Sequence, residues 1–146
     1  MVTIFYRGGW CPFCNVQLRS FQLVRTRLRA LKTSIVLISP QQSDQALSLV
    51  EEHALQFPLL TDVGNQVARQ YGIVFPLDLE LRARHLANGI DLATINGDES
   101  WELPVPATFV IDRAGLIRYA FVNADYTQRA EPAEVLAVLQ RLASGR

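Results

Sequence analysis

The sequence predicts a single α/β domain in which a central mixed β-sheet is flanked by helices. Two apolar runs, Val2 to Tyr6 and Ser34 to Ser39, are typical of buried strands, and each precedes a segment with helical periodicity. Strands that alternate with helices favour parallel pairing. Two later strand-like runs are separated by a short turn and predict an antiparallel hairpin, which makes the sheet mixed.

Composition and charge restrict the classes of protein and partner. The chain has 146 residues, of which 49% are hydrophobic, and this suits one globular domain over residues 1–146. Fourteen basic residues balance 14 acidic ones, so no net field attracts nucleic acid or an anionic membrane. No leader-like pattern or long apolar window occurs. We therefore expect a cytoplasmic protein with no nucleic-acid or membrane partner.

In the first half of the chain, apolar residues recur at helical spacing. Pro12 suits the first turn of a helix because its missing N–H costs nothing there. The apolar stripe of this helix comprises Cys14, Leu18, Phe21, Val24, Leu28 and Leu31. A second helix is predicted from an N-cap at Ser43 to Leu55, and a third is predicted from a cap at Asp62 through Tyr71, with Gly72 as its terminator.

The second half contains an insertion and a hairpin. Residues 75–104 combine a charged helical patch with a polar loop, and we interpret them as an insertion rather than a second domain. The runs "ATFVID" and "LIRYAFV" predict two strands joined by a turn at Asp112 and Gly115. A final helix is predicted to begin near Pro132.

The only two cysteines, Cys11 and Cys14, lie where the first strand meets the first helix. The N–H groups and the positive dipole end of a helix stabilise a thiolate, so the pKa of Cys11 should fall below its free value of about 8.5. Cys14 follows one turn later on the apolar stripe and should be better protected. It could close a disulfide with Cys11 and release whatever the first sulfur attacked. The pair therefore predicts a two-thiol redox site.

A metal site is the rival interpretation of the cysteine pair. A tetrahedral zinc site needs four ligands, and the only histidines, His53 and His85, are isolated on predicted helices. An iron–sulfur cluster would require two chains to share their cysteines, and Asn15 replaces the histidine of a haem-attachment motif. We expect no metal and no cofactor.

Aromatic and proline residues adjoin the two predicted site segments. Trp10 and Phe13 could shield the thiolate or contact a substrate, although simple packing explains them equally well. Pro106 precedes a predicted strand at a point where a proline within a central strand would be out of place, which raises the hypothesis of a special turn with a cis Val105–Pro106 bond. The alternative is an ordinary trans proline at the first residue of the strand.

The sequence resembles the peroxiredoxin-like proteins of the AhpC/TSA class of thiol-specific antioxidants, which belong to the thioredoxin superfamily. The segments that carry this resemblance are "FYRGGWCPFCNVQLR", "YGIVF" and "NGDESWELPVPATFVIDRAGLIRYAFVNADYTQRAEP". It implies a thioredoxin fold, a peroxidatic Cys11, a resolving Cys14 and a cis-proline at Pro106 facing the sulfurs. It also implies that Cys11 is oxidised by a peroxide to a sulfenic acid, condenses with Cys14, and is reduced by a thioredoxin-type or glutathione-type donor.

The chain departs from the usual peroxiredoxin pattern. The family motif Pro-x-x-x-Thr-x-x-Cys has Ile4 and Gly8 at its proline and threonine positions here, and Pro106 stands at the position of the family arginine. The usual peroxide-activating set is therefore expected to be absent. Arg7 could supply a positive charge near the thiolate, and a surface role fits it equally well.

These departures keep two other functions open. A CxxC pair with a cis-proline is typical of thioredoxin-like protein disulfide oxidoreductases, in which the backbone at Val105 would pair with a substrate strand. A non-catalytic or metal-binding module of the same fold is the third hypothesis. Relatives usually carry an extra segment before "VTIFY", and a first strand left exposed by its absence favours a homodimer.

Overall fold

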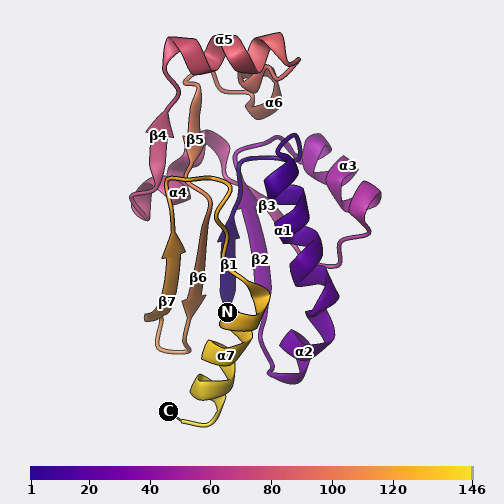
Figure 1. Ribbon diagram of the computed structural model, residues 1–146, viewed down its shortest axis with the longest axis vertical. Helices are drawn as coiled ribbons and strands as arrows, with labels where there is room; N and C mark the ends of the chain where they lie inside the picture. Colours follow the sequence, from indigo (N-terminus) through magenta and orange to yellow (C-terminus); the bar gives the residue numbers. More distant parts are fainter. Residues whose placement is uncertain (146) are drawn as a thin grey trace.

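The computed structural model describes residues 1–145 and contains a five-stranded mixed sheet in the order β3-β2-β1-β6-β7 (Figure 1). The strands are β1 (Val2–Phe5), β2 (Ile35–Ser39), β3 (Leu59–Thr61), β6 (Ala107–Ile111) and β7 (Ile117–Val122). The first three strands are mutually parallel, whereas β6 is antiparallel to both β1 and β7. The predicted mixed sheet and the predicted hairpin are confirmed.

Strand β1 is the middle strand of this sheet. Val2 is opposite Ile35 of β2 on one side and Val110 of β6 on the other, and all four residues of β1 are buried. The expectation that the first strand is exposed is therefore wrong, because both edges of β1 are already paired. The homodimer stays a prediction that this pairing does not support. The outer strands of the sheet are β3 and β7.

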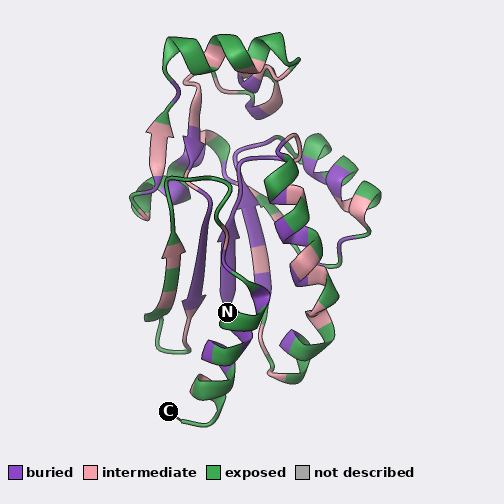
Figure 2. Ribbon diagram, in the orientation of Figure 1, coloured by how far each residue is buried: buried purple, intermediate pink, exposed green. Residues whose placement is uncertain are grey.

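The two faces of the sheet carry separate apolar clusters. The central strands are mostly buried, whereas much of β7 is exposed (Figure 2). Val2 and Ile4 pack in the larger cluster, together with side chains from α1 (Pro12–Leu23), α2 (Arg25–Ala30) and α7 (Pro132–Ala143). Phe5 belongs to the other cluster, where its ring centroid lies 5.0 Å from that of Tyr71. This division follows from the period of two along a strand, which sends successive side chains to opposite faces.

The helices begin close to where the sequence predicts, with two differences. Pro12 is at the start of α1, but the predicted continuous stripe is interrupted at Val24, which has φ −99° and ψ 9° and separates α1 from α2. Helix α3 (Ser43–His53) is preceded by Gln42, so Ser43 is the first helical residue and not the N-cap. Neither difference moves the start of α1, which is the helix end that carries the cysteines.

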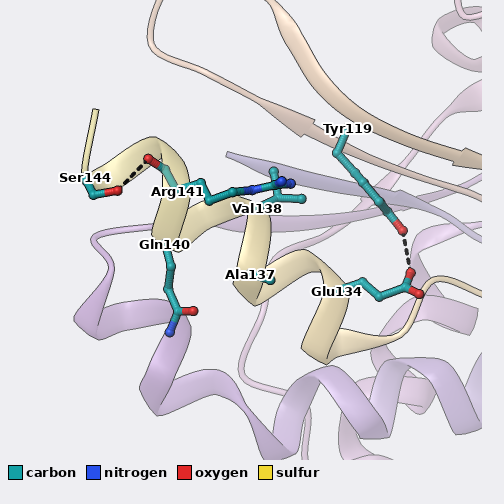
Figure 3. Close-up of a pocket in the computed structure, with 7 residues that line it drawn as sticks. All are labelled: Tyr119, Glu134, Ala137, Val138, Gln140, Arg141 and Ser144. Carbon is teal, nitrogen blue, oxygen red and sulfur yellow. Dashed lines mark hydrogen bonds between the residues drawn. The ribbon is translucent and has the colours of Figure 1, made fainter. Parts of the chain in front are cut away.

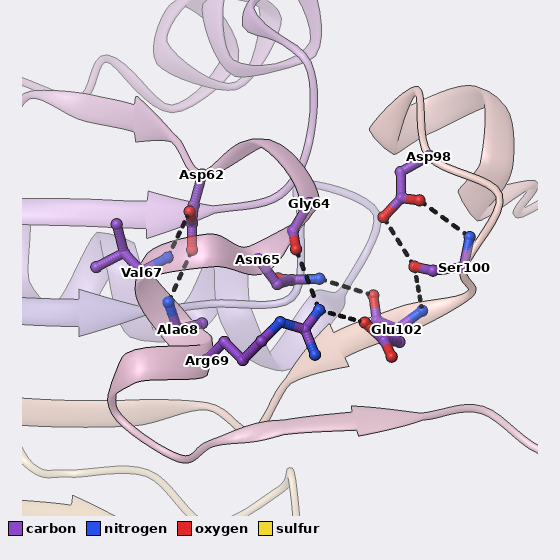
Figure 4. Close-up of polar contacts among 9 residues, drawn as sticks. All are labelled: Asp62, Gly64, Asn65, Val67, Ala68, Arg69, Asp98, Ser100 and Glu102. Carbon is purple, nitrogen blue, oxygen red and sulfur yellow. Dashed lines mark hydrogen bonds and ion pairs between the residues drawn. The ribbon is translucent and has the colours of Figure 1, made fainter.

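The carboxylate of Asp62 accepts from the first turn of the next helix, although Asn65 and not Asp62 holds the N-cap position of that helix (Figure 4). Its two carboxylate oxygens accept hydrogen bonds, each of 2.9 Å, from the N–H groups of Val67 and Ala68. A 3-10 turn over Val63–Asn65 leads into α4 (Gln66–Gln70), and Gly72 follows with a φ of 70° that favours glycine.

The insertion has more regular structure than the sequence predicts, since only the charged helical patch that forms α5 (Leu79–Ala87) was expected. Strands β4 (Val74–Pro76) and β5 (Glu102–Pro104) form an antiparallel ribbon, and α5 and α6 (Leu92–Asn96) lie beyond it, at the top of Figure 1. Arg69 of α4 forms a 2.6 Å ion pair with Glu102 of β5 (Figure 4). Asn65 also donates a 3.1 Å hydrogen bond to the carbonyl of Glu102. These contacts fix one end of the insertion to the main domain.

The cis-proline expected at Pro106 is not present, because the Val105–Pro106 bond is trans. Pro106 lies between β5 and β6, one residue before the first residue of the β6 ladder. It therefore removes no N–H from the ladder, and an ordinary trans bond suffices to lead into a central strand. No helix within residues 1–145 is long and apolar enough to cross a membrane.

Candidate functional site

The two cysteines meet at the start of α1, directly beyond the end of β1. Cys11 is the N-cap of the helix and has an extended backbone, with φ −93° and ψ 111°, while Cys14 lies within the first turn. Both are free thiols, and both are buried, with 1% and 0% of their surface exposed. The backbone N–H of Arg7 donates to the Cys14 sulfur at 3.4 Å. The dithiol is therefore held between a strand end and a helix start.

An arginine that the sequence did not identify contacts both sulfurs. The Nη2 atom of Arg129, in the segment that precedes α7, lies 3.2 Å from the sulfur of Cys14 and 3.8 Å from that of Cys11. Arg129 is 118 positions from Cys11, so no local spacing links them. It occurs in the stretch "NADYTQRAEP", which carries part of the family resemblance but contains no motif that marks a site residue. A guanidinium is thus present beside the dithiol, although the usual family position holds a proline.

Two hydrogen bonds fix the orientation of Arg129. Its Nη1 donates to the side-chain oxygen of Gln17 at 2.9 Å, and its Nε donates to the carbonyl of Tyr126 at 2.7 Å. Gln17 is buried on α1 and donates in turn to the hydroxyl of Thr108 on β6 at 3.3 Å. Gln17 therefore acts as a positioning residue that links the guanidinium to the sheet.

The thiols carry opposite pKa shifts. A hydrogen bond from the Cys14 thiol lowers the pKa of Cys11 to about 5, assisted by the charges of Arg7 and Arg129 and opposed by burial. Burial, followed by the hydrogen bond and the charge of Cys11, raises the pKa of Cys14 well above its usual value. The closer approach of Arg129 to Cys14 opposes this rise without reversing it, because a second negative charge beside the first is disfavoured. The pair therefore holds one negative charge, which resides on Cys11.

Alkylation of the reduced protein should reveal this charge. We expect the rate of iodoacetamide modification to reach half its maximum near pH 5, well below the value of about 8.5 for an ordinary thiol. Burial of Cys11 slows the reaction at every pH without moving the midpoint. The Cys11→Ser variant should lose the phase at low pH. A midpoint near 8.5 in the wild type would show that the site does not stabilise the thiolate.

Removal of the Gln17 amide should weaken that stabilisation. In Gln17→Leu the Nη1 of Arg129 loses its acceptor, and a hydrogen bond of this kind contributes about 1 kcal/mol. We expect the alkylation midpoint of Cys11 to rise by roughly half a pH unit. Gln22→Leu is the matched control on the same helix, because Gln22 bonds the backbone of Gln56 instead. Equal alkylation midpoints in Gln17→Leu and Gln22→Leu would show that Gln17 does not position Arg129.

Aromatic side chains surround Arg7 at the edge of the site. The Arg7 guanidinium lies 4.8 Å from the ring centroid of Trp10 and 4.6 Å from that of Tyr126. His85 of α5 is not isolated, because its Nε2 lies 3.5 Å from the Nη2 of Arg7 and its ring contacts Trp10. Phe13 is 43% exposed, and its ring meets that of Tyr126 edge to face. The insertion therefore reaches the dithiol region through α5.

Val105 and Pro106 lie on the wall of a small cavity next to Arg7. This cavity has a volume of about 180 Å³. The N–H of Val105 is already used, since it donates to the carbonyl of Ile73 at 2.6 Å. A substrate strand could not pair with that N–H without breaking this bond.

No group of three or more His, Cys, Asp or Glu side chains within residues 1–145 is arranged to hold a metal ion. A shallow hollow of about 730 Å³ lies between β7 and α7, and neither cysteine lines it (Figure 3). Tyr119 and Glu134 line this hollow. The hydroxyl of Tyr119 donates a 3.0 Å hydrogen bond to the carboxylate of Glu134, so the two polar groups are paired with each other.

The model of the AhpC/TSA family matches residues 1–120, which include the dithiol, the insertion, β6 and the first part of β7. The chain belongs to the AhpC/TSA family. The resemblance stated from the sequence is thereby confirmed, and so is the thioredoxin-type fold that it implied. Arg129 lies beyond the matched residues, so this member draws its guanidinium from a part of the chain that the family model does not cover.

Curated relatives and solved structures place this family member near the peroxiredoxins. Peroxiredoxin Q of Sedum lineare is 25% identical over 142 residues, which are 97% of this chain and 64% of that protein. A relative from Oryza sativa, also a peroxiredoxin Q, is 24% identical, and the chain covers 55% of its length. The chain thus spans less than two thirds of these relatives. The crystal structure of peroxidoxin BcpB from Mycobacterium tuberculosis has a TM-score of 0.74 at 21% identity, with 97% and 78% of the two chains covered.

A second solved structure with a similar fold comes from a protein that was studied for its enzymatic activity. It is the bacterioferritin comigratory protein of Xanthomonas campestris, with a TM-score of 0.73, 14% identity, and coverage of 97% of this chain and 78% of that one. That protein was analysed for its alkyl peroxide reduction activity in trapped intermediate and ligand complexes. At these identities the likeness to both solved structures establishes the fold of this family member.

Proposed function

We propose that the protein reduces peroxides, with Cys11 as the attacking thiolate and Cys14 as the resolving thiol. The observation that carries this proposal is the set of groups on the Cys11 sulfur: a helix start, a neighbouring thiol and the Arg129 guanidinium at 3.8 Å. Membership of the AhpC/TSA family and the peroxiredoxin relatives support it. The guanidinium also offers N–H groups to the oxygens of a peroxide, where negative charge develops as the O–O bond breaks.

The steps balance without a metal or an organic cofactor. The Cys11 thiolate attacks one peroxide oxygen, the O–O bond breaks, and the departing oxygen takes a proton and leaves as an alcohol or water. Cys11 is then a sulfenic acid. The Cys14 sulfur attacks the Cys11 sulfur, water leaves and a disulfide forms. One dithiol donor of the thioredoxin type, or two molecules of a monothiol donor of the glutathione type, supplies two electrons and two protons to restore the dithiol and ends as a disulfide. We propose that this cycle runs in the cytoplasm.

Protein disulfide exchange, the alternative suggested by the CxxC pair, has less support. That interpretation requires a backbone next to the dithiol that is free to pair with a substrate strand. The N–H of Val105 is instead bonded to Ile73, and the Val105–Pro106 peptide is trans. The comparisons also point to peroxiredoxins.

Peroxide consumption by the purified protein tests the proposal. With hydrogen peroxide or an alkyl hydroperoxide and a dithiol donor, we expect turnover that Cys11→Ser abolishes, because serine is not ionised at neutral pH. Insulin disulfides should be reduced no faster than by the donor alone. Turnover of insulin without turnover of peroxide would replace the proposed function by disulfide exchange.

A further inference from the structure

Arg7 is a buried cation with an unused donor. Its residue surface is only 8% exposed, and its Nε has no hydrogen-bond partner among residues 1–145. None of the ion pairs of the described chain includes Arg7. A buried, incompletely paired guanidinium is costly, and this cost falls when an anion binds to it. Arg7 is therefore prepared to receive a negatively charged group.

The cavity that Arg7 borders is otherwise almost entirely apolar. Apart from Arg7, His85 and the hydroxyl of Tyr126, its lining is formed by the apolar residues Phe75, Leu77, Leu81, Val105, Pro106 and Ala124. Its volume of about 180 Å³ corresponds to roughly six water-sized groups at ~30 Å³ each. A ligand that matches this lining has a short hydrocarbon tail and one anionic end.

We propose that this cavity binds a small carboxylate with a hydrocarbon tail, and that the carboxylate pairs with Arg7. A carboxylate can accept N–H groups from a guanidinium, and among the described residues Arg7 is the only arginine or lysine that lines this cavity. The insertion then has a defined role, because β4, the residue after it and α5 build the apolar wall of the site. The Arg7 guanidinium lies against the rings of both Trp10 and Tyr126, and these contacts hold it at the edge of the cavity.

Binding at Arg7 should oppose ionisation of Cys11. The charge of Arg7 contributes to the low pKa of the Cys11 thiol, so the thiolate and a bound carboxylate compete for the same cation. By reciprocity, a ligand that disfavours the thiolate must itself bind more weakly when the thiolate is present. The carboxylate should therefore bind the Cys11→Ser variant several-fold more tightly than the reduced wild type.

Pentanoate is a suitable test ligand because it has one carboxylate and a short hydrocarbon tail that fits the cavity. Binding can be followed by the Nε–H resonance of Arg7 in a ¹⁵N spectrum, because this group belongs to the guanidinium at the site. At neutral pH and constant ionic strength, we expect a saturable shift of this resonance with pentanoate. Pentanamide, which lacks the charge, and acetate, which lacks the tail, should give none at the same concentrations. An equal response to pentanoate and pentanamide would overturn the proposal.

Variants locate the binding and guard against misfolding. Arg7→Gln should weaken pentanoate binding, followed through backbone amides, by at least about tenfold, whereas Arg27→Gln on the exposed face of α2 should not change it. Leu81→Trp fills the cavity from a side chain that is 37% exposed, and it should abolish binding while Arg7 remains. Wild-type affinity in either Arg7→Gln or Leu81→Trp would exclude this site. Equal affinity in the reduced wild type and Cys11→Ser would exclude the competition with the thiolate.

Discussion

Substitution of Arg129 by methionine should slow the reaction with hydrogen peroxide by about 10- to 100-fold, and it should also raise the pKa of Cys11. The side chain donates to both sulfurs and carries one of the two positive charges that lower this pKa. A hydrogen bond from a charged group contributes about 1.5–3 kcal/mol, which corresponds to this range of rates. Stopped-flow peroxide kinetics and the pH profile of alkylation measure the two effects separately.

Two further variants test whether geometry matters beyond charge. Arg129→Lys keeps a cation but cannot donate to Gln17, to the Tyr126 carbonyl and to the sulfurs from one planar group, so it should recover only part of the rate. Arg118→Met is the matched control, because Arg118 pairs with Asp112 at the β6–β7 turn. A peroxide rate for Arg129→Met within twofold of the control would show that this guanidinium does not activate the site.

Loss of the second thiol should separate oxidation from resolution. In Cys14→Ser, Cys11 should still react with peroxide, but the sulfenic acid should persist because no neighbouring thiol can displace its oxygen. Trapping with dimedone and mass measurement should find one modified Cys11 per chain. Steady-state turnover should fall to near the rate of direct reduction by the donor, a loss of about 100-fold or more as the intramolecular step is removed.

A comparison of serine with alanine at position 14 isolates the hydrogen bond. Serine can still donate to the Cys11 thiolate, whereas alanine cannot, and this hydrogen bond is the largest contribution to the low pKa of Cys11. The alkylation midpoint should therefore rise much more in Cys14→Ala than in Cys14→Ser. Each variant keeps Cys11 as its single cysteine, so no disulfide can form within one chain. If Cys11 formed a disulfide with another copy of the protein, the product would be a covalent dimer. Such a dimer at the wild-type rate would contradict the resolving role of Cys14.

The low pKa also links stability to pH. The pKa of Cys11 is near 5 in the folded protein and about 8.5 when unfolded, so the thiolate stabilises the reduced fold fully only above the unfolded value. This stabilisation is lost progressively as the pH falls toward 5. Relative to Cys11→Ser, the melting temperature of the reduced protein should therefore decrease between pH 8 and pH 6.

Local patterns predicted most of the fold. The β-branched run at Val2 to Phe5, the proline after Cys11 and the turn at Asp112 each specify an element through neighbouring residues, and all three elements form as expected. The break at Val24 was missed because its side chain continues the apolar stripe, and periodicity does not report backbone angles. The β4–β5 ribbon was missed because each of its strands has only three residues.

The candidate site was predictable only where it is local. The CxxC pair is visible in the sequence because the strand, the helix start and both sulfurs lie within a few residues. Arg129 and His85 reach the site through tertiary structure, and nothing in the sequence near either residue indicates which way its side chain points. The prediction of a cis bond before Pro106 was wrong. It followed the family resemblance, whereas the bond adopts the trans form that most X–Pro bonds prefer.

The most direct test of the central claim is a single-turnover measurement in which the reduced protein is mixed with hydrogen peroxide and free thiols are counted as tryptophan fluorescence changes. Trp10 adjoins Cys11 and should report its oxidation. We predict that two thiols disappear per peroxide consumed, in a reaction at least about 100-fold faster than that of an unassisted thiolate, and that Cys11→Ser shows no reaction. Oxidation at the rate of an unassisted thiolate, or loss of thiols that persists in Cys11→Ser, would contradict the account.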